Sequence, residues 1–255
     1  MKQTIVVKIG SSTLTAGTNR ISRGKLEDIA RQLIQLKDKY QVVLVSSGAI
    51  ATAKQFINIQ NWENAIASKQ AMSAIGQPKL MQLYSEVFGD FDLRIAQCLM
   101  TNRDFENEES RNNTLNTINE LFSHGFIPII NENDTTSVEE LALGDNDKLS
   151  ALVATLLKAD KLIIASDIDG LYDKNPYLHK DAVLIKEVFN LESVQKYIQE
   201  RDNGLGTGGM TTKIKAIEIC FAHNIEVCLV NGNRPRFIEE VLEGDGVFTR
   251  FVNNK

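Results

Sequence analysis

The chain has 255 residues, of which 43% are hydrophobic and 24% charged, and its formal net charge is −5. A chain of this length can bury a substantial core, either as one large domain or as two small ones. The acidic balance argues against a general nucleic-acid or membrane surface, because both favour an excess of basic side chains. Any anionic ligand must therefore be met by locally concentrated positive charge.

Cysteine usage and the N-terminus indicate a reduced, cytoplasmic protein. Cys98, Cys220 and Cys228 have no CxxC spacing, and the last two lie in apolar runs typical of core positions. The apolar run at residues 5–9 is too short for a signal-peptide core or a membrane span. We therefore expect cytoplasmic localisation, with no membrane association.

Short β-branched runs alternate with amphipathic helical patterns along the chain, which predicts a doubly wound α/β fold with a parallel sheet. The predicted strands span residues 4–9, 42–46, 93–97, 126–130, 161–165 and 226–230. The predicted helices span residues 23–38, 63–88 (with a break near Gly76-Gln77-Pro78), 113–124, 148–158 and 210–224. We expect one domain over residues 1–255, in which residues 181–203 could form a small subdomain or flap. Ligands of such sheets bind outside the carboxyl ends of the strands.

The first candidate site is the segment from Val7 to Ser12, in which Lys8 interrupts an apolar strand and Gly10 and Ser11 follow it. A buried lysine needs a partner or a ligand, and the turn after it offers N–H groups suited to a phosphate. An edge-strand lysine that faces water is the competing interpretation.

Small and polar residues follow two further strands. Ser46-Ser47-Gly48-Ala49 lets a ligand approach the backbone, although a serine of this segment could equally cap a helix. Asn131-Glu132-Asn133-Asp134 and Gly144-Asp145-Asn146-Asp147 supply amides and carboxylates that can bind an α-amino acid, with Asp134 or Asn146 meeting the ammonium. Metal binding is a rival interpretation, but the spacing lacks the EF-hand glutamate. Ordinary Asx-rich turns would look similar.

The last two candidate segments suit a nucleotide. Ser166-Asp167-Ile168-Asp169-Gly170 again follows a strand directly, and Asp167 could hold the nucleotide. The glycine-rich loop at residues 204–209 leads into a helix whose first turn contains Lys213. The helix dipole disfavours a cation there unless an anion binds beside it. A flexible loop with a solvated lysine is the competing interpretation.

Taken together, the order and spacing of these motifs resemble the amino acid kinase family over nearly the whole chain. The resemblance rests on the segments already quoted and on four stretches that extend or add to them: Ala74-Ile75-Gly76-Gln77 with Leu80-Met81, Leu149-Ser150-Ala151, Asp169-Gly170-Leu171-Tyr172, and Gly206-Thr207-Gly208-Gly209-Met210. It implies an αβα sandwich around a mainly parallel eight-stranded sheet. It also implies ATP and Mg²⁺ as co-substrates, with Mg²⁺ held mainly by the ATP phosphates and no protein metal ligands.

Within the family the resemblance points to members that phosphorylate the side-chain carboxylate of L-glutamate, the first step of proline biosynthesis. It assigns roles to residues by position. The catalytic residues are Lys8, Lys213 and Asp147. The substrate-binding residues are Ser47, Gly48, Ala49, Asn131, Asp134 and Asn146. The nucleotide-binding residues are Lys8, Gly10, Ser11, Ser166, Asp167, Thr207, Gly208, Gly209, Met210, Thr211, Thr212 and Lys213.

The resemblance also sets expectations about partners. It implies a homo-oligomer (a dimer or a tetramer) and a glutamyl phosphate reductase that consumes the product. Many members carry a C-terminal PUA-type domain associated with RNA binding; we expect it to be absent here, and no nucleic acid to be bound. The rival functions are a kinase for N-acetylglutamate, aspartate or a nucleoside monophosphate, and a catalytically silent amino-acid sensor.

Overall fold

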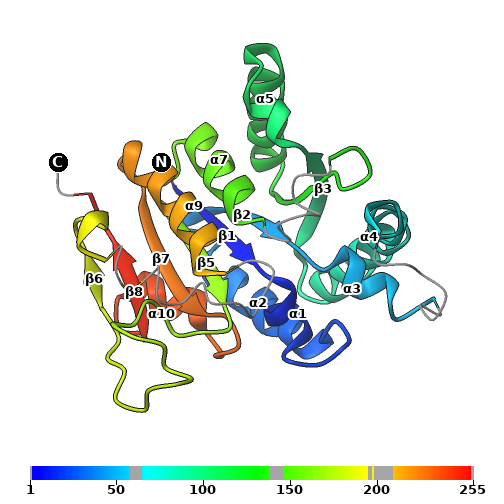
Figure 1. Ribbon diagram of the computed structural model, residues 1–255. Helices are drawn as coiled ribbons and strands as arrows, with labels where there is room; N and C mark the ends of the chain where they lie inside the picture. The colour runs from blue at the N-terminus through cyan, green and yellow to red at the C-terminus, as the bar shows by residue number, and fades with distance from the viewer. Residues whose placement is uncertain (1, 58–64, 138–145, 195–196, 198–208, 254–255) are drawn as a thin grey trace.

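Eight strands of the chain form one sheet, covered by helices on both faces (Figure 1). The computed structural model describes residues 2–57, 65–137, 146–194, 197 and 209–253. The strands are β1 (Gln3–Ile9), β2 (Tyr40–Ser46), β3 (Arg94–Met100), β4 (Phe126–Glu132), β5 (Lys161–Ser166), β6 (Glu187–Val188), β7 (Glu226–Asn231) and β8 (Phe248–Phe251). The helices are α1 (Ser11–Thr15), α2 (Arg23–Leu36), α3 (Ala49–Ala53), α4 (Ile66–Gly89), α5 (Glu108–Ser123), α7 (Asp147–Leu157), α9 (Met210–Ala222) and α10 (Phe237–Glu243), with short 3₁₀ helices at Asn102–Phe105 and Leu191–Val194.

The strand order is β3-β4-β2-β1-β5-β7-β8-β6, and every neighbouring pair is parallel except β7 with β8. The predicted fold class, an α/β sandwich with a mainly parallel eight-stranded sheet, is therefore confirmed. β1 lies at the centre, hydrogen-bonded to β2 and β5, which explains why its side chains from Ile5 to Ile9 are all buried.

The two faces of the sheet bury two separate cores. One face packs against α2, α4 and α10 and takes Ile5, Val7 and Ile9 from β1. The other packs against α7 and α9 and takes Val6. Side chains alternate along a strand, so Lys8 points to the same face as Val6. Its ammonium group is therefore directed toward α7 and α9.

The structure corrects several details of the predicted elements. The six predicted strands are present, but β6 and β8 were not predicted, because each is only two to four residues long. Residues 187–188 join the sheet through β8, so this described part of the proposed flap belongs to the sheet edge. The short helices α1, α3 and α10 were also missed, and α5 begins at Glu108 rather than at residue 113.

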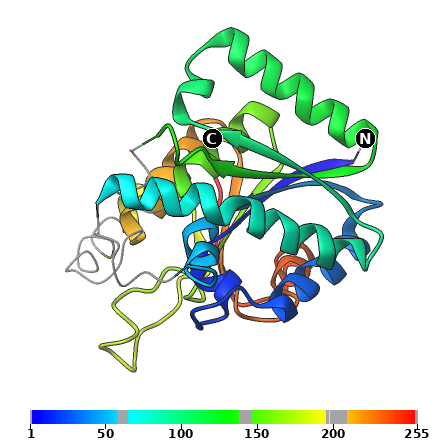
Figure 2. The same cartoon turned by 90° about the vertical axis from the view of Figure 1, so that its right-hand side faces the viewer.

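The predicted break near Pro78 is wrong, because α4 runs unbroken from Ile66 to Gly89 (Figure 2). Pro78 cannot bond to the carbonyl of Ala74, but both residues lie on the exposed side of the helix, where water can take the missing bond. Gly76 has a different role. A Cβ atom there would lie 1.8 Å from the carbonyl oxygen of Ala49, so only glycine lets α4 pack this closely on α3.

Two further findings concern the molecule as a whole. Cys220 and Cys228 are buried free thiols, as expected, and Cys98 is partly buried. Among the residues that the structure describes, no helix combines the length and the apolar character needed to span a bilayer.

Candidate active site

Lys8, Asp147 and Lys213 meet above the carboxyl end of β1. The Nζ of Lys8 lies 2.7 Å from one oxygen of Asp147, and the Nζ of Lys213 lies 3.1 Å from the other. All three are buried, with 3%, 0% and 8% of their surfaces exposed. Lys8 therefore faces the protein interior, which contradicts its interpretation as a water-facing edge lysine.

This trio concentrates positive charge in an acidic protein. Two ammonium groups share one carboxylate, so the cluster carries a net charge of about +1 in a place with little water. The hydroxyl of Thr212 also donates to Asp147, at 3.0 Å. Lys213 is the fourth residue of α9, where the helix dipole opposes a cation, and the Asp147 carboxylate offsets that conflict. An anion brought to the cluster would be attracted by both lysines.

A chain of amides lies beside the trio and contains three of the predicted substrate residues. The side-chain Nδ2 of Asn146 donates to Oγ of Ser47 at 2.9 Å and to Oδ1 of Asn131 at 2.8 Å. Asn146 is the N-cap residue of α7 and directly precedes Asp147. The amide chain and the lysine cluster therefore meet at the start of the same helix.

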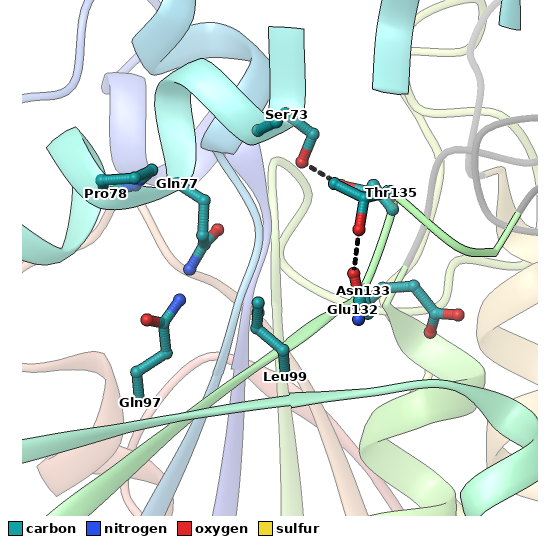
Figure 3. Close-up of a pocket in the computed structure, with 10 residues that line it drawn as sticks. Ser73, Gln77, Pro78, Gln97, Leu99, Glu132, Asn133 and Thr135 are labelled. Atoms are coloured by element: carbon teal, nitrogen blue, oxygen red, sulfur yellow. Dashed lines mark hydrogen bonds between the residues drawn. The ribbon is translucent and has the colours of Figure 1, made fainter. Parts of the chain in front are cut away.

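Asp134 lies just beyond β4 and is held by α4. The hydroxyl of Ser73 donates to its Oδ2 at 2.6 Å. Partial burial raises the pKa of the Asp134 carboxyl above its ordinary value, and the bond from Ser73 counteracts this. Asp134 and Ser73 also line a cavity of about 300 Å³ between α4 and the ends of β3 and β4, with Gln77, Gln97 and Leu99 around it (Figure 3).

Gly48 and Ala49 follow Ser47 at the end of β2. Gly48 adopts φ 108°, which favours glycine, and forms the N-cap of α3. The expected serine cap is therefore wrong, and the hydroxyl of Ser46 instead lies 2.8 Å from that of Tyr84. The backbone turn after β2 therefore directs Ser47 toward Asn146.

The predicted nucleotide residues surround the ends of β1 and β5 and the start of α9. β1 and β5 are hydrogen-bonded neighbours. Gly10 and Ser11 follow β1 beside the place where Ser166 ends β5 and Asp167 follows it. Gly209 caps α9, whose first residues are Met210, Thr211 and Thr212. Thr207 and Gly208 lie outside the described residues.

A second polar cluster braces the loop after β5. Asp169 accepts hydrogen bonds from Arg234 at 2.9 Å, from Asn231 at 3.1 Å and from Tyr172 at 3.2 Å. Burial would raise the pKa of Asp169, but these bonds and the charge of Arg234 lower it below the ordinary value. The loops after β5 and β7 are therefore linked at this edge of the sheet.

Three contacts at the site had no counterpart in the sequence analysis: those made by Ser73, Gln77 and Arg234. For Ser73 and Gln77 the available signal in the sequence is that two polar residues lie four positions apart on a helix face that is otherwise apolar. This signal becomes informative only when the direction of α4 in the fold is known. Within the described ranges, no three His, Cys, Asp or Glu side chains come close enough together to hold a metal ion.

The fold and the site place the chain in a known class of proteins. A match to the amino acid kinase family covers residues 3–231, and the chain belongs to that family. A UMP kinase from Ureaplasma parvum has the same fold: its crystal structure superposes with a TM-score of 0.68 at 18% identity, covering 99% of this chain and 100% of that one.

Within the family, the chain is similar to glutamate 5-kinases. It is 42% identical to the enzyme of Clostridium acetobutylicum over 250 residues, which cover 97% of this chain and 94% of that protein. It is 40% identical to the enzyme of Photorhabdus laumondii over 251 residues, which cover 98% of this chain and 68% of that longer protein.

Proposed function

We propose that the chain transfers the γ-phosphoryl group of ATP to the side-chain carboxylate of L-glutamate, which gives L-glutamyl 5-phosphate, the first intermediate on the route to proline. The observation that carries the proposal is the buried Lys8–Asp147–Lys213 cluster, which adjoins the Ser47–Asn146–Asn131 chain. Similarity to glutamate 5-kinases at about 40% identity supports the choice of acceptor.

The chemistry requires charge neutralisation more than proton transfer. The acceptor carboxylate is already ionised at pH 7, so no general base is needed. The barrier lies in bringing this anion in line with an anionic phosphoryl group. Fixed positive charges in a site poor in water lower that barrier most effectively.

Each part of the cluster has a role in this scheme. Lys8, together with the backbone of Gly10 and Ser11, cradles the transferred phosphoryl group. Lys213 stabilises the leaving β–γ oxygen from the start of α9. Asp147 touches both lysines and holds their ammonium groups in register. Mg²⁺ arrives bound to the ATP phosphates and supplies further positive charge there.

The remaining predicted residues divide between the two substrates. Ser47, Asn131, Asp134 and Asn146 bind the amino acid, and Gly48 and Ala49 give it access to the backbone. Ser166, Asp167 and the segment of residues 207–213 bind the nucleotide. A carboxylate at Asp134 and amides at Asn131 and Asn146 suit a free α-ammonium group, which favours glutamate over N-acetylglutamate.

A coupled assay of ADP release with Mg-ATP and glutamate tests the proposal. Hydroxylamine in a parallel reaction should trap the acyl phosphate as a hydroxamate. Activity with N-acetylglutamate, aspartate or a nucleoside monophosphate but not with glutamate would contradict it. Lys8→Ala and Lys213→Ala should each lower kcat by about 10²-fold or more, by analogy with the loss of one transition-state donor.

We also propose a cytoplasmic homo-oligomer, a dimer or a tetramer, whose product is consumed by a glutamyl phosphate reductase. The reactivity of an acyl phosphate supports a dedicated consuming enzyme. Apolar side chains on one side of the molecule support self-association, since Leu99 on the edge strand β3 and Ile75 on α4 are 43% and 38% exposed. Light scattering on the purified chain measures the oligomeric state.

A further inference from the structure

Gln77 lies on the face of α4 that covers the carboxyl end of β4 and is 7% exposed. Ser73, one turn earlier on the same face, is 4% exposed. Each of them holds one residue of the amino-acid site: Ser73 donates to Asp134, and Gln77 accepts a bond from Nδ2 of Asn131 at 2.8 Å. Figure 3 shows the Ser73 hydroxyl directed toward the segment that follows β4 and the Gln77 side chain extending from the helix into the cavity, near Gln97.

The direction of the hydrogen bonds in this region is fixed by the backbone. The N–H of Glu132 donates to Oδ1 of Asn131 at 2.9 Å, and a backbone N–H can only donate. The oxygen of Asn131 is thereby assigned, and its Nδ2 must face Gln77. Gln77 must in turn present its oxygen, since two amide nitrogens cannot bond to each other. Asn146, the second partner of the Asn131 oxygen, must present its nitrogen.

This assignment decides what the site offers a ligand. Both donor hydrogens of Asn146 are directed to protein oxygens, those of Asn131 and Ser47. Asn146 can therefore meet a ligand only as an acceptor. The Ser47 oxygen accepts from Asn146, so any contact that its O–H makes is made as a donor. An acceptor beside a donor complements the ammonium and the carboxylate of an α-amino acid.

We propose that Gln77 is a positioning residue that sets the polarity of the Gln77–Asn131–Asn146–Ser47 chain and so makes the site select acceptors with an α-ammonium group. The inference deepens the proposed function and rests on it. Gln77 touches neither substrate in this scheme. It acts by holding Asn131: without the Gln77 oxygen, one buried hydrogen bond of the Asn131 amide is lost and the orientation of the chain is less strictly set.

The test compares three variants in the full-length chain. Gln77→Met removes the acceptor at similar volume, and Gln77→Glu keeps an acceptor oxygen facing Asn131 in either protonation state. Gln82→Met is the matched control, because Gln82 lies on the exposed side of the same helix and bonds only to Glu86 among the described residues. ADP release is measured with glutamate and with glutarate, which has both carboxylates but no ammonium, at varied ATP.

Gln77→Met should raise the KM for glutamate about tenfold or more, the range expected when a buried donor loses its partner. The preference for glutamate over glutarate in kcat/KM should fall by a similar factor. The KM for ATP should stay within about twofold of the original value, because a change at Gln77 should not affect the residues that bind the nucleotide. Gln77→Glu should restore most of the preference, and Gln82→Met should match the unmodified chain.

An unchanged preference in Gln77→Met, an equal rise in both KM values, or no rescue in Gln77→Glu would overturn the inference. If Gln77→Met does not fold, Gln77→Asn replaces it, because its shorter side chain withdraws the oxygen from Asn131. Failure of the proposed function is distinguishable, since the unmodified chain would then release no ADP with glutamate. Calorimetric titration of glutamate and glutarate into both proteins would still decide the role of Gln77.

Discussion

Asp147 is the residue whose change should affect both stability and catalysis most. Asp147→Asn leaves two buried ammonium groups without their shared carboxylate. We expect a loss of about 3–5 kcal/mol in the free energy of unfolding, as for other broken buried ion pairs, and a fall of about 10²-fold or more in kcat. Urea denaturation and the ADP assay measure the two effects.

The control for Asp147→Asn is Asp90→Asn, which makes the same chemical change in an exposed ion pair with Arg23. Exposed pairs contribute little, so this variant should keep both its stability and its rate. An Asp147→Asn protein with a normal kcat would contradict the role given to Asp147 in aligning the lysines.

Asp134 should set the acid limb of the pH profile. Burial raises its pKa, so the carboxylate that we assign to the substrate ammonium becomes protonated at a higher pH than an ordinary aspartate does. The kcat/KM for glutamate should therefore fall as the pH decreases through that raised value. Ser73→Ala removes the bond that stabilises the ionised form and should shift the limb to still higher pH.

The KM for ATP, measured at the same pH values, serves as an internal control for this pH profile. Asp134 belongs to the amino-acid side of the proposed site, so the KM for ATP should not follow the same limb. If the pH at which kcat/KM for glutamate falls is the same in Ser73→Ala as in the unmodified chain, Asp134 does not control that acid limb.

At the scale of elements, the contact between α3 and α4 depends on a single glycine. Gly76→Ala would place a methyl group 1.8 Å from the carbonyl oxygen of Ala49, so the helices must separate. We expect a loss of about 3 kcal/mol or more, at the upper end for overpacking, and a raised KM for glutamate, because α4 also positions Ser73 and Gln77. Thermal unfolding and steady-state kinetics test this.

Gly89→Ala is the matched control for Gly76→Ala. Gly89 ends the same helix, and an added Cβ meets no atom within 4 Å. Replacing a helical glycine with alanine at such a site should leave the stability unchanged or raise it by about 0.5–1 kcal/mol. Equal losses in the two variants would mean that helix propensity, rather than close packing, governs α4.

At the scale of the whole molecule, an ion cluster at the amino ends of β5 and β7 ties β8, the strand antiparallel to β7, to the sheet. Glu226 lies 2.6 Å from Lys161 and 2.9 Å from Arg250. Burial would raise the pKa of Glu226, but the bonds from Arg250 and Lys161 lower it below 4.5. Because the pKa is lower when folded, this group stabilises the fold above that ordinary value, and its contribution disappears as the pH falls through the lowered pKa.

Glu226→Gln should therefore cost about 1.5–3 kcal/mol at pH 7, the range for a hydrogen bond to a charged group. The difference from the unmodified protein should shrink as the pH falls below 4.5. Denaturation curves at several pH values measure it, with the exposed Glu218→Gln as control. The kinetic constants should not change, because Glu226 lies at the opposite end of the strands from the proposed site. A constant difference at every pH would contradict the linkage.

The sequence by itself determined the six longer strands, the parallel sheet and the positions after each strand where polar residues gather. These features depend on local patterns: continuous apolar runs, small residues after strands, and a lysine in an apolar strand. It also named Lys8, Asp147 and Lys213, although residues 8 and 147 are far apart in the chain. The family resemblance, rather than any local pattern, placed them in one site.

Only the tertiary structure decided which partner each polar group takes. Whether Lys8 faces water or a carboxylate depends on β1 being central, and that follows from strand order rather than from strand sequence. The continuity of α4 through Pro78 depends on which side of the helix meets solvent. The role of Gln77 depends on a chain of bonds through Asn131, Asn146 and Ser47, which the sequence separates by as many as 99 positions. Hydrogen-bond direction is set by neighbours in space, so no local pattern could have revealed it.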